Sequence, residues 1–289
     1  MRKQIYCLLS FLWISCLSVS AADRWAINSA GGITWQVDER VPHEDHIEMS
    51  GLRVSTVLRY GVDANGAFML NRSMVWPMLR TIPNNTHASL MRRFAWNVTD
   101  MVEVNGQSLL NEKVKEVTLN GTMVVQSEYT LPRKGKLGLT RILFPSVSNP
   151  AFCEKYILRN IGESAISVEI PSSRSVVETD AAKGVDGSYK LVSTINGQVA
   201  RQLQPGEELT FSATFAGYKK DERELSLDID RELQARQYNV RLCKNPWSGK
   251  YLRYERRPYA WPRRRILLCC YLGKRPGGIY QPFLPLFGI

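Results

Sequence analysis

Apolar and alternating residues form short runs along most of the chain, from Trp25 to Tyr218. Turn residues separate these runs at roughly every 8 to 14 positions. The runs cover residues 33–37, 52–60, 67–76, 89–96, 101–104, 114–119, 122–129, 137–144, 152–159, 165–170, 188–195 and 209–218. A period of two places successive side chains on opposite faces of a strand, so the pattern predicts many short β-strands.

The sequences between the runs are typical of tight turns. Asn105-Gly106 and Asn120-Gly121 are dipeptides favoured in two-residue hairpins, and Gln204-Pro205-Gly206 precedes the last run. No long segment before residue 220 has a helical apolar period. We therefore predict an all-β fold, a large antiparallel β-sandwich of the supersandwich type, over residues 22–220.

The pattern changes after residue 220. Residues 221–238 (DERELSLDIDRELQARQY) combine spaced leucines and isoleucine with charges and contain no glycine or proline, which indicates a short linker helix. Residues 239–289 show neither the strand period of two nor the helical period of about 3.6, and they contain six of the fourteen prolines. We predict an irregular tail there.

The first 21 residues have the pattern of an export signal. Arg2 and Lys3 precede an apolar run that ends near Val19-Ser20-Ala21, where small residues suit a signal peptidase. The run is shorter than the roughly 20 residues of a membrane-spanning helix. We expect cleavage after Ala21, a periplasmic or extracellular mature chain and no transmembrane segment in it; lipoprotein processing at Cys16 is the alternative.

Positive charge is concentrated in the tail. From residue 241 onward there are eleven Lys and Arg and one acid, which leaves 27 of the 38 basic and 26 of the 27 acidic residues elsewhere. The body is thus close to neutral. A basic tail can bind anionic polymers, but we expect no nucleic-acid partner for an exported protein.

Cysteine usage indicates a fold stabilised by its core. Of six cysteines only Cys153 lies in the body, so no disulfide framework is expected there. About 268 residues remain after signal cleavage, enough to bury a sizeable core.

The densest polar group in the body is His43, Asp45, His46 and Glu48. We interpret it as a loop, for which three roles are open: hydrogen-bonded packing on another domain, contact with sugar, or metal binding through the two histidines and an acid. The sequence has no Gly-rich phosphate loop and no Cys-x-x-Cys pair, and we expect no metal and no cofactor.

Trp76, Arg80 and His87 are further candidates for carbohydrate or interdomain contact. Trp76, like Trp35 and Trp96, could stack on a sugar ring or belong to the core. Arg80 could bind a carboxylate or satisfy loop carbonyls. No nucleophile-elbow pattern accompanies His87, which argues against a hydrolytic triad.

Four stretches carry a family resemblance: residues 42–51 (PHEDHIEMSG), 75–87 (VWPMLRTIPNNTH), 143–146 (LFPS) and 178–189 (ETDAAKGVDGSY). With them, residues 25–235 resemble the N-terminal region of secreted bacterial glycoside hydrolases of the six-hairpin class. In that class a β-sandwich precedes an (α/α)6 toroid. The resemblance implies a carbohydrate-processing role for an intact protein in which the toroid supplies the chemistry.

The sequence itself places no catalytic pair of carboxyl groups in the body. We expect the chain to be a β-sandwich fragment of an exported glycoside hydrolase, inactive alone, whose partners are carbohydrate or the missing catalytic domain. A carbohydrate-binding or anionic-polymer-binding surface module is the alternative. Residues 239–289 can be back-translated and shifted by one nucleotide into a string typical of helical hairpins, so we also expect a frameshift near residues 233–239.

Overall fold

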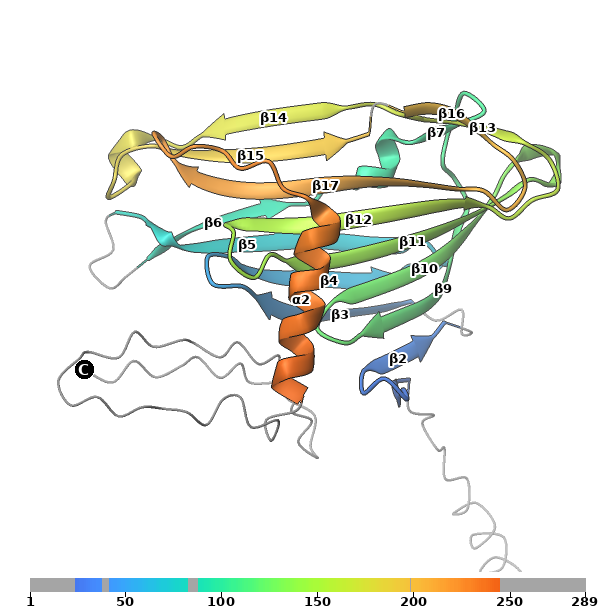
Figure 1. Ribbon diagram of the computed structural model, residues 1–289, viewed down its shortest axis with the longest axis horizontal. Coiled ribbons are helices and arrows are strands. Elements are labelled where there is room, and N and C mark those ends of the chain that lie inside the picture. The colour runs from blue at the N-terminus through green and yellow to red at the C-terminus, as the bar shows by residue number, and fades with distance from the viewer. Residues whose placement is uncertain (1–23, 38–41, 83–87, 198, 245–289) are drawn as a thin grey trace, which may run out of the picture.

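The computed structural model describes residues 24–37, 42–82, 88–197 and 199–244. The expected signal segment, His87 and the tail from residue 245 lie outside these ranges. The prediction of an all-β sandwich is confirmed: antiparallel sheets make up most of the described chain (Figure 1).

The largest sheet has nine strands, and every neighbouring pair is antiparallel. In spatial order they are β1 (Ala26–Ile27), β2 (Ile33–Gln36), β9 (Glu112–Leu119), β10 (Met123–Thr130), β11 (Lys136–Pro145), β12 (Ala151–Asn160), β17 (Glu208–Lys219), β15 (Tyr189–Asn196) and β14 (Ser173–Glu178).

Two smaller antiparallel sheets complete the sandwich. One contains β3 (His43–Ser50), β4 (Ser55–Val62), β5 (Phe68–Arg80) and β6 (Ser89–Phe94), and the other β16 (Val199–Leu203), β13 (Ile166–Ile170), β7 (Glu103–Val104) and β8 (Gln107–Ser108). Single 3₁₀ turns lie at η1 (Val98–Met101), η2 (Pro132–Lys134) and η3 (Ala181–Lys183).

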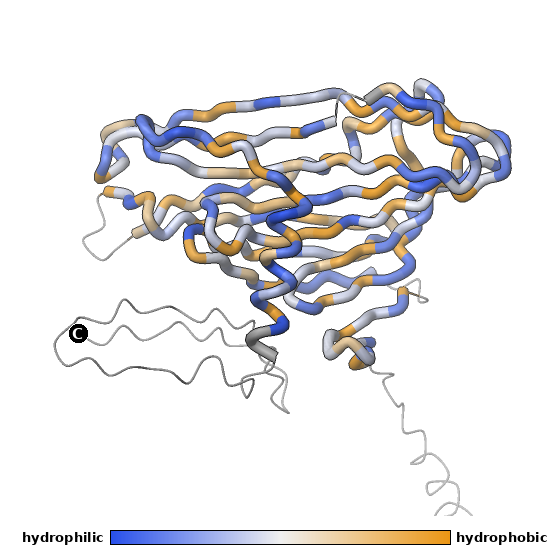
Figure 2. Tube along the Cα trace, in the orientation of Figure 1, coloured by the Kyte–Doolittle hydropathy of each residue, from blue (hydrophilic) through white to orange (hydrophobic). Residues whose placement is uncertain are grey.

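The core lies between the nine-stranded sheet and β3–β6. Leu58 and Tyr60 of β4 are buried with Phe152 and Tyr156 of β12 in one large apolar cluster. Hydrophobic and hydrophilic positions alternate along these strands, as Figure 2 shows. The period of two read from the sequence is therefore the period with which side chains enter the core.

Helix α2 (Ile229–Lys244) begins later than the predicted linker helix and ends later. Its start is explained by Asp228, whose carboxylate accepts hydrogen bonds from the backbone N–H groups of Asp230 (3.0 Å) and Arg231 (3.1 Å). A capping aspartate of this kind fixes the first turn of a helix. Residues 221–228 have no helical structure.

Helix α2 packs on the outer face of the large sheet, crossing β11 and β12 in Figure 1. Ile229 and Leu233 bury their side chains against Phe144 and Cys153. The guanidinium of Arg236 donates hydrogen bonds to the carbonyl oxygens of Gly121 (2.9 Å) and Ser50 (2.7 Å). The helix is thus part of the sandwich at least as far as Arg236. No helix in the described ranges is long and apolar enough to cross a membrane.

The interpretation of residues 43–48 as a loop is wrong, because they form most of β3. The strand was missed because its outer face is entirely polar, so the apolar alternation shows only at Ile47 and Met49. Strands β14 and β16 were also not predicted.

Candidate functional site

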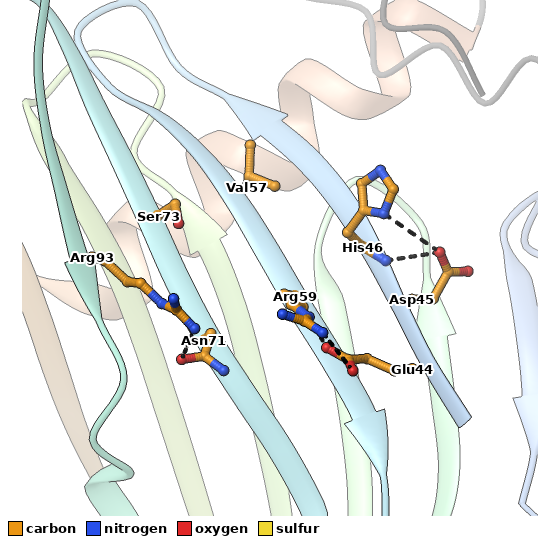
Figure 3. A pocket seen from close by; sticks show the side chains of 8 residues that line it. All are labelled: Glu44, Asp45, His46, Val57, Arg59, Asn71, Ser73 and Arg93. Atoms are coloured by element: carbon orange, nitrogen blue, oxygen red, sulfur yellow. Dashed lines mark hydrogen bonds and ion pairs between the residues drawn. The ribbon is translucent and has the colours of Figure 1, made fainter. Parts of the chain in front are cut away.

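The outer face of the β3–β6 sheet contains a shallow depression of about 470 Å³ (Figure 3). Strands β3, β4, β5 and β6 all contribute to it. Its lining is polar apart from one valine and consists of Glu44, Asp45, His46, Val57, Arg59, Asn71, Ser73 and Arg93. The register explains the grouping, since His46, Arg59 and Asn71 lie opposite one another across three strands.

Ion pairs and hydrogen bonds organise the depression. Arg59 donates through Nη2 to Glu44 Oε2 at 2.9 Å, and Arg93 donates through Nη2 to Asn71 Oδ1 at 3.2 Å. Arg59 on β4 thus binds a carboxylate of β3, and Arg93 on β6 binds an amide oxygen of β5 (Figure 3). The result is a nearly charge-balanced, hydrogen-bonding surface.

The depression is chemically suited to weak binding of hydroxyl-rich or mixed-charge molecules. Its charged side chains remain accessible, with Arg59 60% and Glu44 41% exposed. Ion pairs at this exposure contribute little to the stability of the fold, and water readily replaces either partner. Catalysis by such groups would require their exclusion from water and fixed positions, which an open sheet face does not provide.

The structure does not bring His43 and His46 together. In a strand, residues three positions apart point to opposite faces. His43 is half-buried against the N-terminal segment, whereas His46 is exposed on the outer face. Within the described residues no group of three His, Cys, Asp or Glu side chains is placed to hold a metal ion.

His43 packs β3 against β2 and against Arg24, which precedes β1. Its ring lies edge-on to Trp35, with centroids 5.3 Å apart, and Arg24 Nη1 lies 2.7 Å from its Nε2. Burial and the neighbouring guanidinium lower the pKa of His43, because both disfavour the imidazolium. A neutral imidazole that accepts a hydrogen bond from Arg24 is a structural contact.

Trp76 is a core residue and is unable to stack on a ligand. It is only 1% exposed, and its indole N–H donates to the carbonyl oxygen of Pro150 at 2.8 Å. Gly217 lies against the indole, where a Cβ would come within 2.7 Å of the ring. Trp35 is likewise buried, whereas Trp96 is 39% exposed.

A second feature is one end of the sandwich, the left end in Figure 1, which we call the turn end. It comprises residues 51–54, 77–82, 146–150, 181–187 and 219–228. Two contacts show its construction: Leu52 N–H donates to the Val147 carbonyl at 2.9 Å, and Ile82 N–H donates to the Lys183 carbonyl at 2.8 Å.

Arg80 belongs to this turn end. Its carbonyl oxygen accepts hydrogen bonds from the Tyr189 hydroxyl (2.6 Å) and the Val185 N–H (2.9 Å). Its side chain is half-buried. Asp45 and His46 lie opposite the first half of β5, whereas Arg80 is the last residue of that strand, so Arg80 shares no site with them. Glu48 is exposed on the outer face of β3.

Ion pairs and exposed apolar side chains together cover the turn end. Arg53 pairs with Glu222 at 2.7 Å and Lys219 with Asp186 at 2.9 Å, around a depression of about 500 Å³. Large apolar side chains at this end are 49–61% exposed, namely Leu52, Met78, Ile82 and Val185. Exposed apolar side chains at the same end of a domain as accessible charges are typical of a protein–protein contact.

The strongly perturbed titratable groups lie in the interior. Burial raises the pKa of Tyr129 to about 12, and it raises those of Tyr156 and the Cys153 thiol. All three are inaccessible in the folded chain, with Cys153 covered by α2. They have no access to substrate and are structural.

Sequence reasoning missed Glu44, Arg59, Asn71, Ser73 and Arg93 in the outer-face depression. Four of them were within predicted strands, at positions alternating with apolar residues, and this signal could have placed them on one face. Without β3 as a strand, the set could not be assembled. His87 lies outside the described residues.

No protein-family model matches the sequence, and no curated protein matches it. Among solved structures, a likeness is found to one described as "Putative kojibiose phosphorylase from human microbiome", with 11% sequence identity and a TM-score of 0.37. It covers 75% of this chain and 36% of that chain. The chain therefore spans about a third of the length of that protein, and a likeness this weak carries no argument about activity.

Proposed function

We propose that this chain is the non-catalytic β-sandwich part of a carbohydrate-processing protein of the six-hairpin class. The observation that carries the proposal is that each of the four stretches of family resemblance has residues at the turn end. Residues 42–51 meet residues 143–146 where Gly51 lies against the Ser146 carbonyl, and residues 75–87 meet residues 178–189 through Arg80 and Tyr189.

In this proposal the turn end contacts the catalytic part. Segments more than a hundred residues apart in sequence are joined there by backbone hydrogen bonds, which makes a preformed surface. Four exposed apolar side chains would leave water when the catalytic part docks, which favours the contact. They are Leu52, Met78, Ile82 and Val185. The chain also leaves β17 at this end and passes through residues 220–228 before it enters α2.

The sandwich itself supplies no chemistry. Glu154 and Glu112 are buried in ion pairs with Arg72 and Arg141, and the accessible carboxylates of the outer face lie on an open surface. We expect the purified full chain to release no sugar from a panel of disaccharides and oligosaccharides. Measurable sugar release, lost on exchange of Glu44 for glutamine, would overturn this assignment.

We further propose that the reading frame changes after Arg236. Arg236 makes buried contacts with two carbonyls, so the helix up to that point is compatible with the rest of the fold. Resequencing of the DNA from codon 220 onward is the test. We expect an open frame, one base over, that encodes a series of amphipathic helical hairpins. Absence of such a frame would overturn this part of the proposal.

A chain with the corrected frame gives the turn end its own test. We expect it to cleave glycosidic bonds, and Met78→Lys or Val185→Lys to lower this activity by placing a charge in the contact. Leu110→Lys is the matched control, because Leu110 is 68% exposed and belongs to no turn-end segment. Equal activity of all three variants would contradict the docking role.

A further inference from the structure

Strand β14 is the terminal strand of the nine-stranded sheet, and no element in the described ranges pairs with its outer edge. Five of its six residues are exposed, including Val176 (39%) and Val177 (42%). It contains no proline. Regular edge strands with exposed valines are templates for pairing with a further strand.

The hydrogen-bonding direction of β14 follows from its register with β15. The N–H of Thr179, directly after β14, donates to the carbonyl oxygen of Tyr189 at 2.9 Å. Backbone groups alternate in direction along an antiparallel strand, and the register of β14 with β15 is regular. Ser173, Ser175 and Val177 therefore bond to β15, and the N–H and C=O groups of Arg174, Val176 and Glu178 point outward.

We propose that β14 pairs antiparallel with β14 of a second copy of this chain, about a two-fold axis at Val176. In this register Val176 faces its own counterpart, and each Arg174 faces Glu178 of the second copy. All three outward-pointing residues become hydrogen-bonded pairs. The two copies extend the sheet continuously across the axis, an isologous contact in which both use the same residues.

Charge complementarity selects this register and a second copy as the occupant. Arg174, Val176 and Glu178 share one face of β14, in the order cation, apolar, anion, so the reversed strand presents anion, apolar, cation. Shifting the axis to Arg174 or Glu178 would place like charges opposite each other, which is unfavourable. On the other face, Ser175 lies opposite Val177.

The ion pair that Arg174 already makes within its own chain is compatible with pairing of the two β14 strands. Arg174 binds Glu224 of the same chain through Nη2 at 2.8 Å, and its guanidinium has further N–H donors. Glu178 is exposed and has no ion-pair partner within the described residues. A contact of one short strand is small, so we expect a dimer that dissociates on dilution.

Light scattering on the full chain over a range of concentrations tests the proposal. We expect the apparent mass to rise about twofold towards that of two chains. Arg174→Glu and Glu178→Arg each place like charges opposite each other and should remain single chains. When the two variants are mixed, opposite charges face each other again, and the mixture should regain the doubled mass.

The mixing result separates edge pairing from unrelated association. Arg159→Glu is the matched control, because Arg159 of β12 is exposed and pairs with Glu208 of β17; this variant should dimerise like the original chain. Hydrogen exchange should slow at the amides of Arg174, Val176 and Glu178 as concentration rises. A single-chain mass at every concentration, or failure of the mixed variants to associate, would overturn the proposal.

Discussion

An Arg–Glu pair occurs both inside the sandwich and on its outer surface, and the two pairs differ in almost every physical respect. Arg72 and Glu154 join β5 to β12, and both side chains are 0% exposed. Arg59 and Glu44 join β4 to β3 and are 60% and 41% exposed. The comparison shows that burial decides whether this pair of residues holds the fold together or remains available to a ligand.

The interior pair is fully hydrogen-bonded. Besides its bond to Glu154, Arg72 donates through Nη1 to the Trp96 carbonyl at 2.9 Å, and the Tyr156 hydroxyl donates to Glu154. Burial is the largest influence and disfavours the charge on Arg72, but Glu154 and Tyr156, through their charges and hydrogen bonds, together outweigh it and raise the pKa of Arg72. Such a network ties the two sheets together at a fixed distance.

The largest expected effect is therefore that of Glu154→Ala. Removal of one partner leaves Arg72 charged, buried and unpaired, which should lower the free energy of unfolding by about 3–5 kcal/mol. Urea unfolding of the full chain followed by tryptophan fluorescence measures it. A loss below about 1 kcal/mol would mean that water enters the interior and solvates Arg72.

A double replacement sharpens this result. Arg72→Met with Glu154→Leu removes both charges, and apolar pairs of similar volume often restore stability. We expect the double variant to be more stable than Glu154→Ala. If both lose the same stability, the cost comes from packing and not from the unpaired charge.

Arg236 lies between the two extremes, since it is buried beneath α2 but its partners are the neutral carbonyls of Gly121 and Ser50. Arg236→Met keeps much of the aliphatic packing and removes two charge-assisted hydrogen bonds. We expect a loss of about 2–3 kcal/mol. Hydrogen exchange should locate it in α2 and the Gly121 turn; exchange that increases uniformly over the sandwich would contradict a local anchor.

The sequence allowed the sheets to be predicted where one face of a strand is apolar and the turns have a specific backbone requirement. Gly106 (φ 72°) and Gly121 (φ 93°) adopt the left-handed conformation expected of the two Asn-Gly hairpin turns. Strand β3 could not be recognised, because its polar side chains indicated a loop. The start of α2 depends on a single cap at Asp228, which the apolar pattern does not contain.

The candidate site was predictable only in part. Asp45 and His46 do line a depression, but the lining residues on the other strands lie 11 to 48 positions away in sequence, and only the sheet register brings them together. Trp76 and His43 do not line this depression, for a different reason. The type of a residue limits what its side chain can bind, but only the packing of the fold determines whether that side chain points to the surface or to the interior.

His43 offers a smaller, pH-dependent test at the boundary between interior and surface. Its pKa is lowered in the folded chain, so below the ordinary histidine value of about 6.5 the unfolded chain binds more protons. Stability should be full above that pH and decline as the pH falls towards the folded pKa. Urea midpoints between pH 5 and 8 should show this decline, and His43→Gln should reduce it. An unchanged pH profile would show that His43 is solvated.

The smallest effect is expected for the exposed pair. In a double-mutant cycle with Arg59→Gln and Glu44→Gln, the coupling energy should be below about 1 kcal/mol, because water and salt screen charges on an open sheet face. It should fall further as ionic strength rises. A salt-insensitive coupling as large as that between Arg72 and Glu154 would contradict the comparison, since it would require the outer face of β3–β6 to be covered in solution. The outer-face depression would then be part of an interface and not a site open to ligands.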